Sequence, residues 1–237
     1  MRILAMDTSA KVCSVAVLED GVLRSEQSTN RNLTHSEMLM PMVEAALDAS
    51  GLAIKDMDLF AVAKGPGSFT GLRIGVSTVK ALGHACGKPV CGVMTLDALA
   101  MNAAHHVGDV VALMDARRGQ VYVARYRGDG QRLQRIGEPE AISLQAYLER
   151  ETFSQDVLLL GDGVAPNEAI IKEMLGQRAI LALPHIRLQR AASIAVLAEK
   201  MANSGESMDQ DALQPLYLRL SQAERERARK LREEAKA

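Results

Sequence analysis

The residues best suited to chemistry in this sequence lie around Gly65-Pro66-Gly67-Ser68. This turn joins an apolar strand, expected at Leu59 to Ala63, to a small-residue helix that starts at about Phe69. Amides at the start of a helix favour an anion, which predicts a phosphate-binding loop. However, the glycines at 65, 67 and 71 miss the dinucleotide fingerprint by one residue, and no Gly-Lys-Ser/Thr follows for a P-loop. A tight strand-to-helix turn capped by Ser68 explains the same residues equally well.

Two aspartates follow apolar stretches that should form buried strands. Asp7 precedes Thr8-Ser9, and Asp115 precedes Arg117-Arg118. In a kinase-like cleft such carboxylates would position Mg²⁺ or a water against a phosphate. The simpler interpretation, which we favour, is that each carboxylate caps the amides of the turn after its strand.

The other motifs also have a structural explanation beside the functional one. Gly161 and Gly163 either flank an adenine or permit the loop that precedes a helix. His35 lies between Thr34 and Glu37, whose spacing is that of a capping box, so the three residues indicate a helix start rather than a metal site. Neither of the adjacent histidines at 105 and 106 has ligand spacing.

Length, charge and cysteine usage bound the class of protein. The 237 residues carry a net charge of −1 and show no aromatic-studded basic stripe, which argues against a dedicated nucleic-acid binder. Apolar runs fall far short of the ~20 residues of a membrane span, and no signal peptide is recognisable. The cysteines are odd in number and lie in apolar surroundings, so we expect reduced core thiols in a cytoplasmic protein: Cys13, Cys86 and Cys91.

The chain repeats itself. Ala5-Met6-Asp7 introduces an alternating stretch at 13–17, and Leu113-Met114-Asp115 introduces another at 121–125 with the same offset. Each copy predicts a three-stranded meander, followed by helices and a further strand. We therefore expect two α/β halves that face a cleft, residues 1–102 with about 189–219 and residues 103–188, unless the similarity is fortuitous. The Glu- and Arg-rich tail at 220–237 should be a solvated helix.

Two helices of the first half carry more apolar residues than one buried face needs. One is expected from Thr34 to about Ser50. The other is the helix that starts at about Phe69, and its apolar residues at positions 72, 74, 76 and 79 do not all fit within a single ~100° stripe. The alternative to a partner interface is that both helices bury these faces on their own sheet. If these faces meet a partner, Gly75→Arg should weaken pairing at a cost of about 1 kcal/mol to the fold. The expected interface contains Met38, Leu39, Met42, Val43, Ala46, Gly71, Ile74, Gly75, Thr78, Val79 and Leu82.

Residues 62–99 resemble the Gcp/TsaD family of ASKHA-fold proteins, the superfamily of actin, sugar kinases and Hsp70. Segments Ile3–Ser9, Gly161–Asn167 and Pro215–Arg219 extend the resemblance over roughly residues 1–219. It implies an α/β fold of duplicated ribonuclease-H-like halves, with mixed sheets flanked by helices. It also implies vestigial nucleotide or phosphate loops, with nucleotide binding left open, at Asp7, Thr8, Ser9, Gly65, Gly67, Ser68, Asp115, Gly161 and Gly163.

Two positions set this chain apart from the catalytic member of that family, TsaD. In TsaD a proline-led strand ends in a His-x-x-x-His pair that holds the metal. Here the strand begins at Pro89, and the matching positions are Thr95 and Leu99. Leucine has no lone pair, and a lone hydroxyl is a poor ligand. The resemblance is therefore to the non-catalytic paralogue, with no metal and no catalytic residue expected in this chain.

The resemblance implies an accessory subunit in the synthesis of N6-threonylcarbamoyladenosine at position 37 of tRNA. Such a subunit would bind and activate TsaD, help recruit the ATPase TsaE, form a homodimer when alone, and meet tRNA through the complex. Metal and ATP are then expected on the partners. One rival is a small ASKHA-type phosphotransferase that uses Asp7, the 65–67 loop and Asp115; another is a homodimeric module with a different client.

Overall fold

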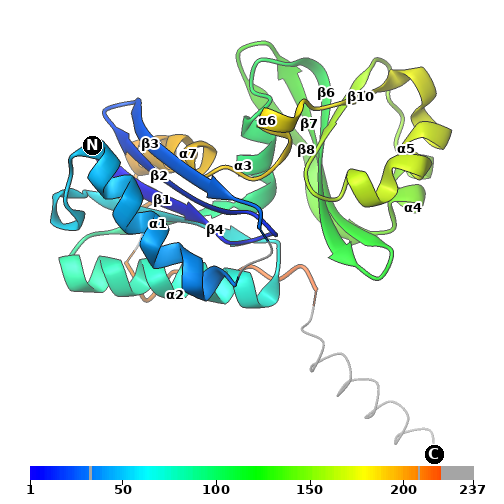
Figure 1. Cartoon of the computed structure of the whole chain (residues 1–237). Helices are drawn as coiled ribbons and strands as arrows, with labels where there is room; N and C mark the ends of the chain where they lie inside the picture. Colours follow the sequence, from blue (N-terminus) through cyan, green and yellow to red (C-terminus); the bar gives the residue numbers. More distant parts are fainter. Residues whose placement is uncertain (32–33, 208, 220–237) are drawn as a thin grey trace, which may run out of the picture.

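The computed structural model describes residues 1–31, 34–207 and 209–219. Two five-stranded mixed sheets lie side by side, each flanked by helices (Figure 1). This arrangement confirms the predicted fold class of two duplicated α/β halves. The tail expected at 220–237 lies outside the described residues.

The first sheet has the order β3-β2-β1-β4-β5. An antiparallel meander forms its first part, and two parallel strands extend it on the other side of β1. The strands are β1 (Arg2–Asp7), β2 (Cys13–Glu19), β3 (Val22–Thr29), β4 (Leu59–Gly65) and β5 (Val90–Met94).

The second sheet repeats this plan in the order β10-β9-β6-β7-β8. The corresponding hairpins pair with a register that differs by one residue: Asp7 pairs with Ser14 across β1 and β2, and Asp115 pairs with Val121 across β6 and β7. The strands are β6 (Val107–Arg117), β7 (Gln120–Asp129), β8 (Leu133–Ile142), β9 (Val157–Leu160) and β10 (Ala179–Leu181).

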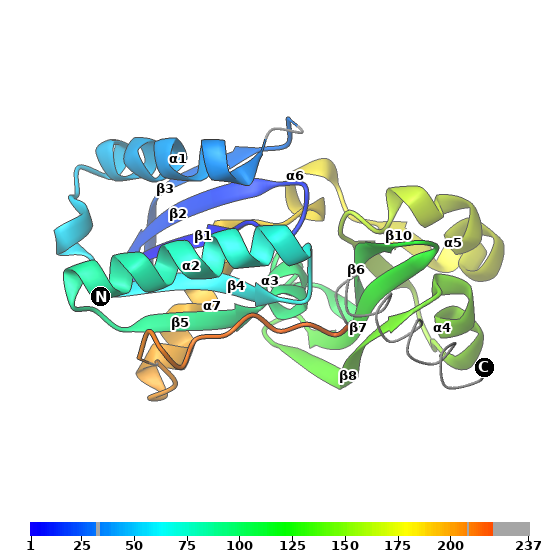
Figure 2. The ribbon, with the colours of Figure 1, turned by 90° about the horizontal axis from the view of Figure 1, so that it is seen from below.

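Helices cover both faces of the first sheet. On one face lie α1 (His35–Ser50) and α2 (Phe69–Cys86), which run side by side (Figure 2), and on the other lies α7 (Ala191–Asn203). Each face of the first sheet has its own hydrophobic core, and successive strand residues point to opposite faces. Leu4 and Met6 therefore face α1 and α2, while Ile3 and Ala5 face α7.

Short helices complete the second half and join it to the first. One face of the second sheet packs against α4 (Leu144–Arg150) and α5 (Glu168–Leu175). The other face packs against α3 (Thr95–Met101), which also contacts α7 and so connects the halves. The remaining elements are η1 (Ile54–Asp56), η2 (Ala165–Asn167), η3 (Gly176–Arg178) and α6 (Pro184–Arg187).

The start of α1 differs in one detail from the prediction. Thr34 is the N-cap, as expected, but its side chain makes no capping hydrogen bond, and the amide of Glu37 donates instead to the Thr34 carbonyl. His35 is held by a contact of 2.7 Å between its Nε2 and the carbonyl of Ala10. The capping-box prediction is therefore wrong, because this tertiary contact fixes the helix start in place of the local cap.

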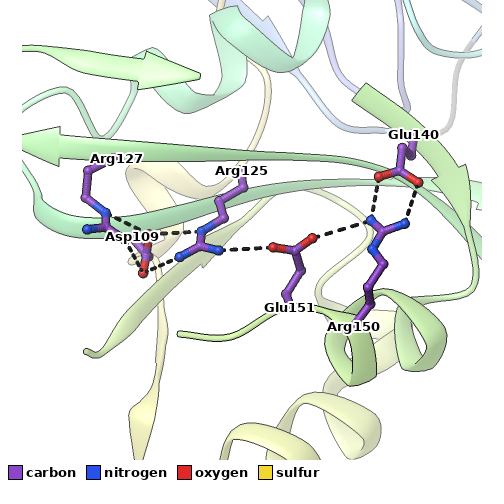
Figure 3. Close-up of polar contacts among 6 residues, drawn as sticks. All are labelled: Asp109, Arg125, Arg127, Glu140, Arg150 and Glu151. Carbon is purple, nitrogen blue, oxygen red and sulfur yellow. Dashed lines mark hydrogen bonds and ion pairs between the residues drawn. The ribbon is translucent and has the colours of Figure 1, made fainter. Parts of the chain in front are cut away.

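A network of ion pairs holds the strands of the second sheet at the end away from Asp115 (Figure 3). Asp109 on β6 is 1% exposed and accepts hydrogen bonds from both Arg125 and Arg127 on β7. Arg125 also bonds Glu151 at 3.0 Å, and the network continues to α4 and β8. Every guanidinium in the network has a carboxylate partner. The charges of these residues are therefore balanced within the fold, and no ligand is needed to account for them.

No helix in the described part of the chain is both long and apolar enough to cross a membrane.

Candidate functional site

The predicted loops lie where the parallel strands of each sheet end. In folds of this kind ligands bind outside the carboxyl ends of strands, so this edge is the place to look for a site. In the first half the loop after β1 meets the turn after β4: the Ser68 amide donates to the Ser9 carbonyl at 2.7 Å. The Gly71 amide donates to Ser68 Oγ at 3.3 Å. Two of the amides that could have bound an anion are thus engaged within the chain.

Asp7 caps its own turn. Its Oδ1 accepts hydrogen bonds from the Ser9 amide at 2.8 Å and from Ser9 Oγ at 2.6 Å. The carboxyl is 1% exposed, and its Oδ2 has no partner among the described residues. Burial raises the pKa of Asp7, because desolvation penalises the ionised form more than the Ser9 donors favour it.

Asp7→Asn should stabilise the protein at neutral pH. A carboxyl whose pKa is raised in the folded state costs stability when ionised, and this cost disappears as pH falls toward the ordinary value of 3.8. Asparagine keeps the Oδ1 acceptor and removes the charge. Thermal melts should show a higher Tm for the variant at pH 7, with the difference shrinking as pH is lowered. A variant that melts lower at neutral pH would mean that the native state needs the ionised carboxylate.

The second half repeats the turn with a more exposed aspartate. Asp115 Oδ1 accepts a hydrogen bond from the Arg117 amide at 2.7 Å, and the Asp115 amide donates to Asp162 Oδ1 at 3.2 Å. Gly161 and Gly163 hold their loop against β6: a Cβ at 161 would lie 1.8 Å from the Leu113 carbonyl oxygen. These glycines therefore permit a close backbone approach, which supports the structural explanation of both residues.

Three residues that lie at this edge, namely Asp162, Lys11 and Gln189, were not singled out in the sequence analysis. Asp162 is largely buried, which raises its pKa, and Lys11 of the β1–β2 turn is close enough to act on it electrostatically across the two halves. Gln189, 2% exposed, precedes α7, and its side chain lies close enough to Asp162 to favour the ionised form of that carboxyl. Asp162 could have been noticed between its two glycines, whereas nothing in the sequence marks Gln189.

The positions that match the TsaD metal ligands are enclosed at the start of α3. Thr95 is fully buried, and its Oγ1 has no partner among the residues described. Leu99 packs in the core of the second half, next to Gly161. Within residues 1–31, 34–207 and 209–219, no three His, Cys, Asp or Glu side chains are grouped to hold a metal ion. Burial also raises the pKa of the Cys13 and Cys91 thiols to about 11, which makes them poor nucleophiles at neutral pH.

Most residues of the expected partner interface point into the chain's own core. These residues belong to α1 and α2 and pack against the first sheet: Leu39, Met42, Val43, Ala46, Gly71, Gly75 and Val79. Of the rest, Val76 is buried in this core and Ile74 is partly buried against its edge, which accounts for the excess of apolar positions in α2. The residues that keep exposed surface, here called the α1–α2 face, are Met38, Ile74, Thr78 and Leu82.

The two glycines of α2 serve a contact within the chain. A Cβ at Gly71 would lie 2.0 Å from the Thr8 carbonyl oxygen, and one at Gly75 would lie 2.4 Å from Thr8 Oγ1. Thr8 Oγ1 in turn donates to the Gly71 carbonyl at 2.7 Å. This corrects the expectation that these glycines face a partner helix and that Gly75→Arg is nearly neutral to folding. The small residues bring α2 close to the end of β1.

The two sheets and their helices form a fold of the ASKHA type. It resembles an activator of 2-hydroxyisocaproyl-CoA dehydratase from Clostridium difficile with a TM-score of 0.53 at 13% identity, over 87% of this chain and 97% of that one. A structure named YeaZ from Pseudomonas aeruginosa agrees better, with a TM-score of 0.76 at 30% identity over 92% and 99% of the two chains.

The sequence comparisons identify the family to which the chain belongs within this fold class. Residues 25–227 match the family model described as TsaD, tRNA N6-adenosine threonylcarbamoyltransferase. The Bacillus subtilis protein named tRNA threonylcarbamoyladenosine biosynthesis protein TsaB is 33% identical over 94% of this chain and 96% of its own length. The chain belongs to the TsaB group of the TsaD family, which confirms the resemblance drawn from its motifs.

Proposed function

We propose that this chain is a non-catalytic subunit of the machinery that makes N6-threonylcarbamoyladenosine at position 37 of tRNA, and that it binds and activates TsaD. The observation that carries the proposal is the pair Thr95 and Leu99, at the positions where the catalyst that the chain resembles has its metal-binding histidines. A buried alkyl side chain and a buried hydroxyl cannot take over that coordination. The match to TsaB over nearly its whole length supports the same assignment.

The proposed docking surface for TsaD is the α1–α2 face. Its apolar side chains are half-buried, and the Thr78 hydroxyl is already satisfied by the Ile74 carbonyl at 2.8 Å, so the face offers apolar area at little desolvation cost. TsaD has a similar fold and would present comparable helices. A second copy of the chain would use the same face, so the homodimer and the TsaD heterodimer exclude each other.

Activation in this proposal is conformational. A subunit without chemistry of its own raises activity only by binding one state of TsaD better than another. Metal and ATP belong to the partners, TsaE joins the assembled pair, and tRNA is held mainly by the complex.

The phosphotransferase alternative is less well supported. It needs Asp7 and Asp115 to face a phosphate or a metal, but Asp7 Oδ1 is occupied by Ser9 and Asp115 Oδ1 by the Arg117 amide. ATP turnover by the purified chain with Mg²⁺ would revive this alternative. A homodimer that does not bind TsaD would instead favour the second alternative, an interaction module with another client.

Sedimentation of the purified chain with and without TsaD tests the proposal. We expect a concentration-dependent homodimer that TsaD converts into a heterodimer, with an interface on the order of 1,600 Å² in total. A chain that sediments independently of TsaD at micromolar concentrations of both would contradict it.

A further inference from the structure

A cluster of two aromatic rings and an arginine lies on the flank of α2 away from α1. The rings of Phe69 and Tyr217 stack with centroids 4.7 Å apart, and the Arg73 guanidinium lies 4.0 Å from the centroid of Phe69. Arg73 Nε also donates to Tyr217 Oη at 3.1 Å. Among the described residues Tyr217, at 37%, is the most exposed aromatic residue. The cluster is thus an ordered aromatic surface in a chain with few aromatics.

The segment that carries Tyr217 crosses from the first half to the second. Residues 213–219, here called the strap, begin at Leu213, which is buried beneath α2. The Leu216 amide donates to the Lys64 carbonyl at 2.6 Å, and Arg219 Nη1 donates to the Ala116 carbonyl at 2.9 Å. Figure 2 shows this orange segment passing from β5 toward the second sheet. The strap therefore reaches the end of β6 at Arg219, two residues after Tyr217 of the aromatic cluster.

That turn presents two arginines in an unusual backbone conformation. Arg117 has φ 60° and Arg118 has φ 57°, in the left-handed region that Gly and Asn adopt far more readily. Both side chains are exposed, and neither forms an ion pair with the described residues. Their nearest acid in sequence, Asp115, is engaged by the Arg117 amide.

The contrast with the arginines of Figure 3 is informative. Arg125, Arg127 and Arg150 are each matched to carboxylates across the sheet. Arg117 and Arg118 of the turn have no carboxylate partner in the described part of the chain, although the chain as a whole carries a slight excess of acid. Two guanidinium groups without a carboxylate partner among the described residues, a few strap residues from an exposed ring, favour a ligand that has phosphates and flat bases.

We propose that the Tyr217 cluster and the Arg117-Arg118 turn form a contact site for unpaired RNA, with a base stacked on Tyr217 and phosphates on the two arginines. The inference rests on the proposed function, since it makes the RNA of that machinery the occupant. Unpaired nucleotides fit better than a duplex, because a paired base cannot leave its own stack to reach an aromatic ring. The site is local and weak: we expect a Kd on the order of 10⁻⁴ to 10⁻⁶ M at moderate salt.

Fluorescence anisotropy of the full chain, without TsaD, tests this site. The probes are a labelled oligouridine, a hairpin with an unpaired loop, and a fully paired duplex, each titrated between about 50 and 200 mM salt. We expect the first two to bind and the duplex to bind less. Tyr217→Leu should weaken binding about tenfold, and Tyr217→Phe should restore it, because the ring and not the hydroxyl does the stacking.

The contribution of Arg117 and Arg118 can be measured separately, through the salt dependence of RNA binding. Arg117→Gly with Arg118→Gly suits the positive φ angles and should lower the slope of log K against log salt by about 1.4. The matched control, Arg132→Ala with Lys172→Ala, removes the same charge from exposed positions elsewhere and should leave affinity and slope unchanged.

Several results would overturn the site while leaving the proposed function intact. These are no binding of any RNA probe at about 10⁻⁴ M, equal losses in the control variant, or RNA binding indifferent to Tyr217→Leu. Weaker capture of TsaD by the Tyr217 and arginine variants, with RNA binding unchanged, would make this surface a protein contact. Conversely, a chain that binds RNA as expected but never captures TsaD would refute the proposed function alone.

Discussion

Gly75→Arg is expected to prevent the first half from folding. A Cβ at position 75 already lies 2.4 Å from Thr8 Oγ1 and 3.0 Å from Val62 Cγ2; Thr8 directly follows β1, Val62 lies within β4, and both are buried. Arginine would add a long charged side chain at this buried contact. The penalty should exceed about 4 kcal/mol, which is a large part of a typical domain's stability.

Circular dichroism and thermal melts of the purified variant check this expectation. Ser77→Arg, two residues along the same helix and exposed, is the matched control and should melt like the wild type. If Gly75→Arg is soluble and melts within a few degrees of the wild type, then the close approach of α2 to β1 does not hold in solution.

Ile74→Arg should leave the fold intact and abolish most of the affinity for TsaD. Ile74 is half-buried at the centre of the α1–α2 face, so an arginine there can extend into water in the free chain. In the complex its charge would be trapped between apolar helices. We expect an affinity loss of at least about 30-fold, the size of an interface hot spot.

Ala169→Arg on α5 is the control for this variant, because it adds the same side chain to an exposed helix of the other half. Titration calorimetry with TsaD should separate the two. Equal affinities for Ile74→Arg and the wild type, with normal melting of both, would place the TsaD interface on another surface.

The sequence predicted the fold well where local patterns agree with tertiary packing. The helix expected from Thr34 to about Ser50 forms at His35–Ser50, and the repeated Asp-turn-strand pattern became two sheets with matching strand orders. The period of apolar residues and the turn chemistry suffice for these features, because burial of one face decides both.

The site was harder to predict, because sequence does not show which surface a small residue meets. Gly71 and Gly75 have the spacing of a helix–helix contact, yet their neighbour is Thr8, more than 60 residues away. Likewise, Thr34 and Glu37 have capping-box spacing, but the His35 contact with Ala10 anchors the helix start instead. The pairing of Tyr217 with Phe69 had no local signal, since the strap places it.

The most direct test of the account measures threonylcarbamoyl transfer to tRNA by three preparations: this chain alone, TsaD alone, and both together with TsaE. We predict no transfer by the chain alone and at least about fivefold stimulation of TsaD when the chain is added, the lower end of typical coupling between sites. Transfer by the isolated chain, above that of a preparation from cells that lack TsaD, would contradict the assignment of a non-catalytic subunit.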